Sequence, residues 1–285
     1  MVSVRHILIP MLILLLPTVS HSRPEAEQAT SVRTSLFAQS AAEALTHEAP
    51  DANVSFLMLD AHTEQLLASR WEDPHLPISL GSLAKPFTAL AYGEQHEFQF
   101  PTHNCRGSKT GCWRPGGHGE VDLTSAIAFS CNSYFRLLTA DLSAADLLPT
   151  ATHFGLDLPD GDMQGAELAG LGSRWRISPM HMAHAYLELL HGRQQPAISR
   201  ILAGMQRSAV RGTGAEVGHA LRSKTALVKT GTAACTHSQL APGDGFVIAM
   251  VPADDPRLLL MIRVHGVPGS IAAKTAGLML RRIEE

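Results

Sequence analysis

The sequence predicts an α+β domain in which an antiparallel β-sheet is flanked by N- and C-terminal helices and carries a mostly helical insertion. The first observation is the order of short apolar runs, two early in the chain and three late, with turn residues between them. The second is the middle of the chain, residues 82–191, which lacks long β-branched runs and shows helical patterns. The third is the composition: 285 residues, 45% hydrophobic and 17% charged, can bury one substantial core.

The chain begins with a segment that is typical of a secretory signal. Arg5 precedes an apolar run over residues 7–19, and Ser20 and Ser22 offer small side chains at the cleavage positions. The run is shorter than the roughly 20 apolar residues that span a bilayer. We therefore expect a signal over residues 1–22 and an exported protein without an integral span, in the periplasm or at the extracytoplasmic face, anchored there only if the signal stays uncleaved.

The domain after the signal, residues 23–285, begins with the first group of strands. Residues 25–47 are Ala-rich with apolar side chains at helical spacing, which predicts an amphipathic helix. Apolar runs at residues 54–60 and 65–69 lie on either side of turn-like residues 62–64. This pattern predicts a β-hairpin.

The second group of strands and the closing helix lie beyond residue 211. Turn elements at residues 242–244 and 252–256 separate apolar runs, as in antiparallel strands. The predicted strands are residues 226–232, 245–251 and 258–264, and the predicted final helix is residues 270–283.

Both strand groups can join one sheet, which leaves the insertion as a second lobe. We expect a sheet lobe from residues of about 23–75 and 212–285, and a helical lobe from about 76–211 with helices at 123–138 and 179–190. A cleft would then lie between the sheet and the helices.

The charge of the chain argues against nucleic acid as a partner. Without residues 1–22 the chain loses one basic side chain and keeps 22 basic and 26 acidic ones, a net charge of −4. Domains that bind nucleic acid are typically basic. We expect no nucleic-acid binding.

Ser82 and Lys85, in the sequence Ser82-Leu83-Ala84-Lys85, are a candidate nucleophile and base. A serine hydroxyl needs a base within hydrogen-bond reach, and residues three apart on a helix share a face. Pro86 favours a helix that starts at Ser82, because the first turn tolerates a residue without an N–H. By itself the pattern favours a helix cap followed by a surface lysine.

The string Lys229-Thr230-Gly231-Thr232-Ala233 lies in a predicted strand. The ammonium of Lys229 would lower the pKa of a nearby Lys85 and attract a substrate carboxylate. Thr230 and Thr232 offer hydroxyls to that carboxylate, and Gly231 has no side chain to block a ligand that lies along the strand. A string of this length is poorly explained as an ordinary strand end.

Ser130-Cys131-Asn132 interrupts an otherwise apolar helical stretch. Buried polar groups need partners. Two interpretations stay open from these residues alone: a helix cap or turn, or a site in which Ser130 shuttles a proton and Asn132 holds an amide.

In this order the three motifs resemble those of the penicillin-binding protein transpeptidases and the related serine β-lactamases. Residues 81–88 are similar to the nucleophile segment of the high-molecular-weight penicillin-binding proteins, and residues 117–135 to the helix of their second motif. Residues 177–186 and 212–214 are similar to a helix before the third motif and to the turn that follows it. The resemblance covers roughly residues 50–283.

The resemblance implies a β-lactamase/transpeptidase-like fold and a penicillin-binding serine DD-transpeptidase or DD-carboxypeptidase without a cofactor or metal. Its implied substrate is the D-alanyl-D-alanine end of a peptidoglycan stem peptide, β-lactam antibiotics would bind covalently, and a cell-wall synthesis protein would be a partner. Backbone N–H groups of Ser82 and Thr232 would form the oxyanion hole. The implied roles are nucleophile for Ser82, general base for Lys85, proton relay for Ser130 and Lys229, and substrate clamp for Asn132, Thr230, Gly231 and Thr232.

The fate of the acyl-enzyme depends on what activates water. Class A β-lactamases, which this chain resembles, carry a Glu-x-x-x-Asn element, whereas Glu167 is followed at that spacing by Leu171. Class D enzymes usually carry Val where this chain has Asn132. Slow deacylation is therefore expected, which favours transpeptidation over β-lactam hydrolysis; carboxypeptidase and β-lactamase activity remain the alternatives.

The four cysteines allow more than one interpretation. Cys105 and Cys112 bracket a short polar loop, and in an exported protein a disulfide between them is favoured. A zinc quartet completed by His103 and His118 is the less favoured alternative, because the spacing fits no common zinc finger. Cys131 and Cys235, beside the second and third motifs, are expected to be small buried hydrophobic residues.

Three other functions fit parts of the sequence. A catalytically silent penicillin sensor would usually carry transmembrane and signalling segments, and a scaffold would not need every motif residue. An esterase with a His base would need a Gly-x-Ser-x-Gly elbow, which residues 81–84 do not form.

Overall fold

A five-stranded antiparallel sheet organises the fold. The computed structural model describes residues 39–47, 53–222, 225–235 and 242–284. The strand order is β2-β1-β9-β8-β7, so both predicted strand groups join one sheet. The strands are β1 (Val54–Asp60), β2 (Leu66–Arg70), β7 (Leu227–Ala233), β8 (Asp244–Val251) and β9 (Leu258–His265).

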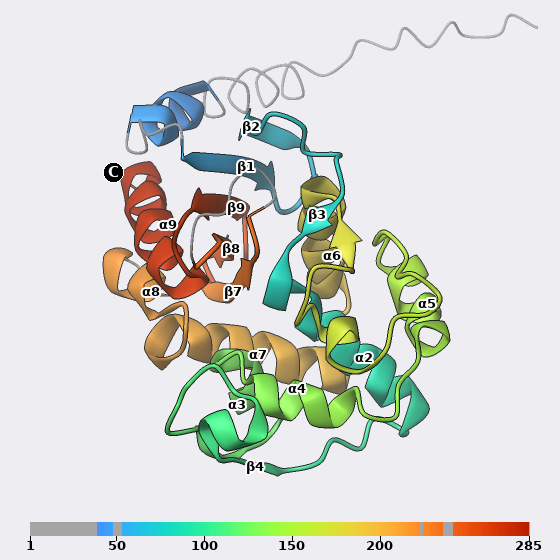
Figure 1. Cartoon of the computed structure of the whole chain (residues 1–285). Coiled ribbons are helices and arrows are strands. Elements are labelled where there is room, and N and C mark those ends of the chain that lie inside the picture. Colours follow the sequence, from blue (N-terminus) through green and yellow to red (C-terminus); the bar gives the residue numbers. More distant parts are fainter. Residues whose placement is uncertain (1–38, 48–52, 223–224, 236–241, 285) are drawn as a thin grey trace, which may run out of the picture.

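Each face of the sheet belongs to a different core. Because side chains alternate along a strand, Phe56 and Met58 of β1 face one way and Leu57 and Leu59 the other. The first face packs under α9 (Gly269–Ile283) and α8 (Ala215–Ala220), with the helix at residues 39–47 nearby (Figure 1). The second face packs against the helical lobe. The predicted α+β architecture is confirmed.

The helical lobe fills the other half of the molecule (Figure 1). Three short 3₁₀ turns and two small two-stranded sheets connect its helices. Its helices are α2 (Lys85–Gln95), α3 (Leu123–Ala128), α4 (Asn132–Leu138), α5 (Ala144–His153), α6 (Pro179–His191) and α7 (Pro196–Arg211); its 3₁₀ turns are η1 (Gly81–Ala84), η2 (Gly107–Thr110) and η3 (Gly165–Ala169); its strands are β3 (Ile78–Ser79) with β6 (Arg176–Ile177), and β4 (His103–Cys105) with β5 (Gly119–Val121).

The helix expected over residues 123–138 is two helices. Helix α3 ends at Ala128, and α4 begins at Asn132 after a turn in which Ser130 has φ of +48°. A left-handed residue cannot continue a right-handed helix. The break therefore re-aims the backbone at the second motif.

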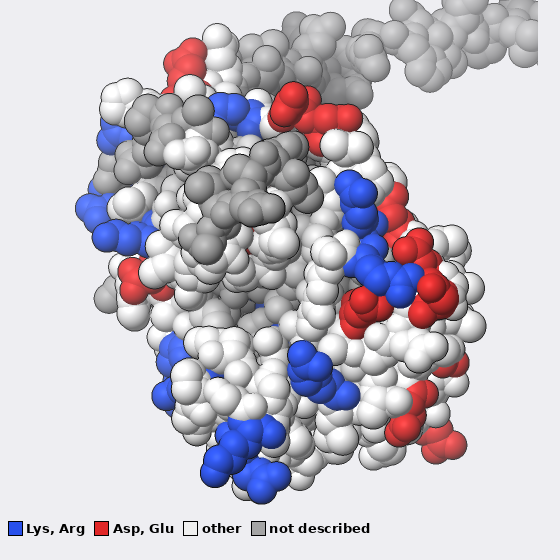
Figure 2. Space-filling model, in the orientation of Figure 1, with Lys and Arg blue, Asp and Glu red and all other residues white. Residues whose placement is uncertain are grey.

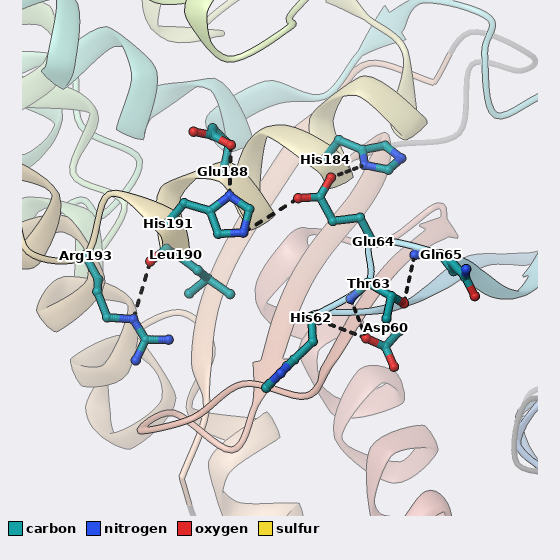
Figure 3. Close-up of polar contacts among 10 residues, drawn as sticks. All are labelled: Asp60, His62, Thr63, Glu64, Gln65, His184, Glu188, Leu190, His191 and Arg193. Carbon is teal, nitrogen blue, oxygen red and sulfur yellow. Dashed lines mark hydrogen bonds and ion pairs between the residues drawn. The ribbon is translucent and has the colours of Figure 1, made fainter. Parts of the chain in front are cut away.

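The β1–β2 turn is tied to α6 (Figure 3). Asp60 Oδ1 accepts the backbone N–H of His62 at 2.9 Å and of Thr63 at 2.8 Å. Glu64, at the position where the resembled family usually carries a glycine, has φ of +59°. Its carboxylate contacts His184 and His191 of α6 at 3.4 Å and 3.7 Å.

Two of the sequence expectations fall outside the described residues, namely the signal at residues 1–22 and the first part of the helix at 25–47. Within the described part of the chain, no helix combines the length and the apolar character that a bilayer span requires. Figure 2 shows basic side chains over β4 and α3 and acidic ones near α5, without a continuous basic surface on this face.

Candidate active site

Ser82 lies where the helical lobe meets the edge of the sheet. It belongs to the 3₁₀ turn η1, which leads directly into α2; Pro86 lies in the first turn of α2, but this helix begins at Lys85 and not at Ser82 as the sequence predicts. Gly81 has φ of +59°, and a Cβ there would lie 2.2 Å from the carbonyl oxygen of Thr232. Only glycine therefore lets η1 approach β7 this closely.

Lys85 is fully buried and is held by the second motif. Its Nζ donates to Asn132 Oδ1 at 2.7 Å and to the carbonyl oxygen of Ser130 at 2.8 Å, with Ser130 Oγ at 3.4 Å. Between Lys85 Nζ and Ser82 Oγ, both in the described part of the chain, there is no hydrogen bond. Catalytic hydrogen bonds often tighten only when substrate binds.

Lys229 reaches the same hydroxyl from the sheet. Its side chain is fully buried, and its Nζ donates to Ser130 Oγ at 2.9 Å and to the carbonyl oxygen of Thr230 at 2.7 Å. Ser130 Oγ is thus shared by two amines that are 144 residues apart in sequence. The structure brings the three predicted motifs together at this atom.

Burial lowers the pKa of both amines. The pKa of Lys85 falls from 10.5 to about 7, chiefly because burial penalises the charged form; the sulfurs of Cys131 and Cys112 act in the opposite direction. The pKa of Lys229 lies well below its usual value because of burial and then the charge of Lys85. The sequence predicts that the charge of Lys229 lowers the pKa of Lys85, whereas burial is the main cause and Arg136 is the cation that adds to it.

The residues predicted to clamp the substrate, Thr230, Gly231 and Thr232, lie on β7 and line the cavity. Thr230 Oγ1 donates to Thr213 Oγ1 at 2.6 Å, and Thr232 Oγ1 accepts the N–H of Gly269 at 2.9 Å. At Gly231, a Cβ would lie 2.4 Å from the carbonyl oxygen of Leu80. Gly231 lines the cavity, and the close approach of the chain before η1 is a second reason for a glycine at this position.

These side chains open onto one cavity of about 250 Å³. Lys85 and Lys229 are buried and do not line it. The motifs give no signal for Trp113, Pro268 or Ser270, because they are distant in sequence or carry no motif pattern. The lining residues are Ser82, Trp113, Ser130, Asn132, Leu171, Thr213, Thr230, Gly231, Thr232, Pro268 and Ser270.

The disulfide expected between Cys105 and Cys112 is absent, since both are free thiols. Their sulfurs instead face His118 Nδ1, at 3.6 Å and 3.5 Å, and Cys112 Sγ lies 3.9 Å from Cys131 Sγ. His103, which the zinc alternative included, contacts Ser133 Oγ at 2.6 Å.

Among the residues that the structure describes, three groups of side chains could hold a metal. Three cysteines and a histidine are the donor set of structural zinc sites, and this cluster is the most buried of the three. The others are Cys235 with Asp244 and His265, and Glu64 with Glu188 and His191.

Comparison with known proteins decides the family. The family model of the penicillin-binding protein transpeptidase domain matches residues 55–283. The chain belongs to this family. No curated protein matches this transpeptidase-family chain in sequence.

Solved structures share the fold at low sequence identity. Pseudomonas aeruginosa PBP2 in complex with WCK 5153 superposes with a TM-score of 0.67 at 18% identity, covering 84% of this chain and 75% of that one. Helicobacter pylori PBP2 in complex with MreC gives 0.72 at 17%, covering 87% and 62%. The D,D-transpeptidase domain of an Eggerthella lenta peptidoglycan glycosyltransferase gives 0.66 at 15%, covering 85% and 80%.

Proposed function

We propose that the protein is a penicillin-binding serine DD-transpeptidase that acts on the D-Ala-D-Ala end of peptidoglycan stem peptides. The observation that carries the proposal is the position of Ser130 Oγ, which receives hydrogen bonds from two buried amines and lies on the same cavity as Ser82. This is the arrangement that a serine acyl transfer needs for moving a proton from nucleophile to leaving group.

In the first step, Ser82 Oγ attacks the carbonyl carbon of the penultimate D-alanine. A neutral Lys85 takes the hydroxyl proton, which its lowered pKa favours near neutral pH. The backbone N–H groups of Ser82 and Thr232 receive the oxyanion. The tetrahedral intermediate then collapses, the C–N bond breaks, and the terminal D-alanine leaves as an amine.

The leaving amine needs a proton, and Ser130 supplies it. Its hydroxyl can pass its own proton to the nitrogen and be reprotonated from Lys85 or Lys229, since both amines contact Ser130 Oγ. The substrate carboxylate is assigned to the hydroxyls of Thr230 and Thr232. In the second step an acceptor amine attacks the acyl-Ser82 ester, which forms the cross-link and frees the serine.

The surroundings of Glu167 support transfer over hydrolysis. Its carboxylate pairs with Arg174 at 3.3 Å, and it does not line the cavity. Leu171 does line it, so an apolar side chain stands where the resembled β-lactamases carry the Asn of their water-activating element. Carboxypeptidase and β-lactamase activities are the second candidates, and both need an activated water.

The partner is inferred from relatives. One structural neighbour is PBP2 in complex with MreC, and another belongs to a peptidoglycan synthase complex. We assign to this chain a partner of the same cell-wall synthesis class.

Incubation of the purified domain with a D-Ala-D-Ala stem peptide, with and without an acceptor amine, tests the proposal. The expected result is a cross-linked product and released D-alanine, with less hydrolysed peptide when acceptor is present. Rapid turnover of penicillin without a persistent adduct on Ser82 would instead identify a β-lactamase. No labelling at all by a fluorescent penicillin would identify a scaffold.

A further inference from the structure

Four side chains outside the proposed proton relay converge next to the second motif. Cys105 ends β4, Cys112 and His118 lie in the loop that leads to β5, and Cys131 precedes α4. One donor atom from each lies within 4.8 Å of the donor atoms of the other three.

The spacing of these atoms fits a tetrahedral metal. With Zn–S of about 2.3 Å and Zn–N of about 2.0–2.1 Å, tetrahedral geometry places sulfurs about 3.8 Å apart and nitrogen about 3.5 Å from sulfur. The observed distances are 3.9 Å from Cys112 Sγ to Cys131 Sγ, and 3.5 Å and 3.6 Å from His118 Nδ1 to Cys112 and Cys105. Hydrophobic packing of thiols would not require this match.

The surroundings of the cluster hold the imidazole in a fixed position. The ring of His118 stacks on Phe129 with centroids 5.3 Å apart. Its buried Nε2 has no hydrogen-bond partner among the described residues, so the sulfurs are its only polar contacts there.

The cluster is also joined to the cavity at two points. Cys131 lies between Ser130 and Asn132, both of which contact Lys85. Trp113 follows Cys112, lines the cavity, and donates its Nε1–H to the carbonyl oxygen of Phe129 at 3.1 Å. A group that binds the sulfurs would therefore also fix the position of the second motif and of Trp113 at the edge of the cavity.

We propose that Cys105, Cys112, His118 and Cys131 bind one zinc ion that holds the Ser130–Asn132 turn in position for acylation, and that oxidation of the thiols switches this support off. The oxidant is a disulfide of the glutathione class. The S–S bond of the oxidant breaks as it accepts two electrons, and the oxidant leaves as two thiolates. Cys112 and Cys131 give up these electrons and form a disulfide. The zinc ion is released without a change of oxidation state. The metal site stands by itself, whereas its coupling to acylation rests on the proposed function.

Metal content tests the site directly. The purified full chain should carry one zinc ion, and Co²⁺ in its place should give the absorption of sulfur-to-cobalt charge transfer and of tetrahedral cobalt. Cys105→Ser should weaken zinc binding by more than about 100-fold, because loss of even an outer-shell partner costs 10- to 100-fold. Cys235→Ser is the comparison variant: it removes a ligand of the other cysteine-containing group, with Asp244 and His265, and it should bind zinc as the wild type does if the ion occupies the four-residue cluster.

The metal site is wrong if the wild-type chain takes up no zinc under reducing conditions, or if Cys105→Ser binds it equally well. Circular dichroism separates a lost ligand from a lost fold. If Cys105→Ser does not fold, the cobalt spectrum of the wild type still decides the ligand set.

Acylation of Ser82 by a fluorescent penicillin tests the coupling. The zinc-free and the disulfide-oxidised wild type should acylate more slowly than the zinc-bound form, by up to about 100-fold, the scale on which misplacing a catalytic group acts. Reductant followed by zinc should restore the rate. Peptide mapping of the oxidised form should find Cys112 joined to Cys131, and Cys112→Ser should not form this bond.

The outcomes separate the two proposals. Zinc bound with no change in acylation rate on its removal overturns the coupling and leaves the transpeptidase proposal intact. A zinc-bound chain that never acylates overturns the transpeptidase proposal and the coupling together, while the metal analysis still decides the site.

Discussion

The two walls of the cavity are built by different means. Lys229, Thr230 and Thr232 stand on β7, whose backbone pairs with β8 at every residue from Leu227 to Ala233. Ser130 and Asn132 stand at the break between α3 and α4, where Ser130 holds φ of +48°. A ladder of hydrogen bonds fixes the first wall by itself. The second wall depends on side chains from elsewhere, above all Lys85.

The largest expected effect is that of Ser82→Ala. Ser82 belongs to neither wall, and its hydroxyl forms the acyl bond that the residues of both walls assist. The variant should lose all covalent penicillin capture, measured by mass spectrometry of the intact protein. Its fold should be unchanged, since the half-buried Ser82 side chain makes no hydrogen bond among the described residues. An adduct of undiminished yield on another residue would contradict the assignment.

The second largest effect is expected for Lys85→Ala, which acts on the wall at the break between α3 and α4. Loss of the general base should slow acylation by about 10²- to 10⁴-fold, and Asn132 Oδ1 loses its donor at 2.7 Å. The fold should persist in circular dichroism. Lys229→Ala is the comparison for the wall on β7. In this variant Ser130 and Asn132 should keep their contacts with Lys85, so Asn132 should remain in place. Equal labelling of wild type and Lys85→Ala would refute the role of the base.

The pH dependence of acylation should report the same amine. Lys85 acts as a base only when neutral, and its pKa is lowered to about 7 by burial. The rate should therefore fall as pH drops below 7, by about tenfold for each unit once most of the amine is protonated. Stopped-flow labelling across the range measures it. A rate that stays flat from pH 8 to well below 7 would show that Lys85 is not the group that titrates.

The smallest effect is expected at Glu64, whose left-handed φ is similar to that of Ser130. Glu64, with φ of +59°, lies far along the β1–β2 turn, and its ion pairs are partly exposed and hence weak. Glu64→Gly should raise the free energy of unfolding by up to about 1 kcal/mol and leave acylation unchanged.

Ser130→Gly relieves a similar φ but removes the hydroxyl that both amines contact. It should gain no stability, because buried Lys229 loses one of its two acceptors at a cost of about 1–3 kcal/mol, and acylation should fall sharply. Chemical denaturation and penicillin labelling of both variants measure the contrast. A stability gain of the same size at both positions would show that the hydrogen bonds of Ser130 Oγ contribute nothing to the free energy of unfolding.

Most strand boundaries were predictable from sequence, as β1 at Val54–Asp60 shows, because a short apolar run bounded by turn residues is a local pattern. The break at Ser130 was not. Neither glycine nor proline marks it, and the apolar pattern runs through it. Lys85 and Lys229 bond to the left-handed turn from distant parts of the chain, in addition to the local bond from the N–H of Cys131 to the carbonyl oxygen of Ala126.

The cysteines show the same limit. Spacing favoured a bond between Cys105 and Cys112, yet in the structure both face His118 and Cys112 lies beside Cys131. No local rule relates Cys131 to a loop that ends 13 residues before it. Contacts between distant segments carry no signature in a single sequence.

The sequence by itself determined the order of strands and helices, the three motifs and the family resemblance, because periodicity and short motifs are local properties. Only the tertiary structure decided that burial lowers the pKa of Lys85, why Gly81 and Gly231 must be glycine, and which thiols lie close together. Burial and close approach are properties of packed surfaces from different parts of the chain, and these exist only once the chain has folded.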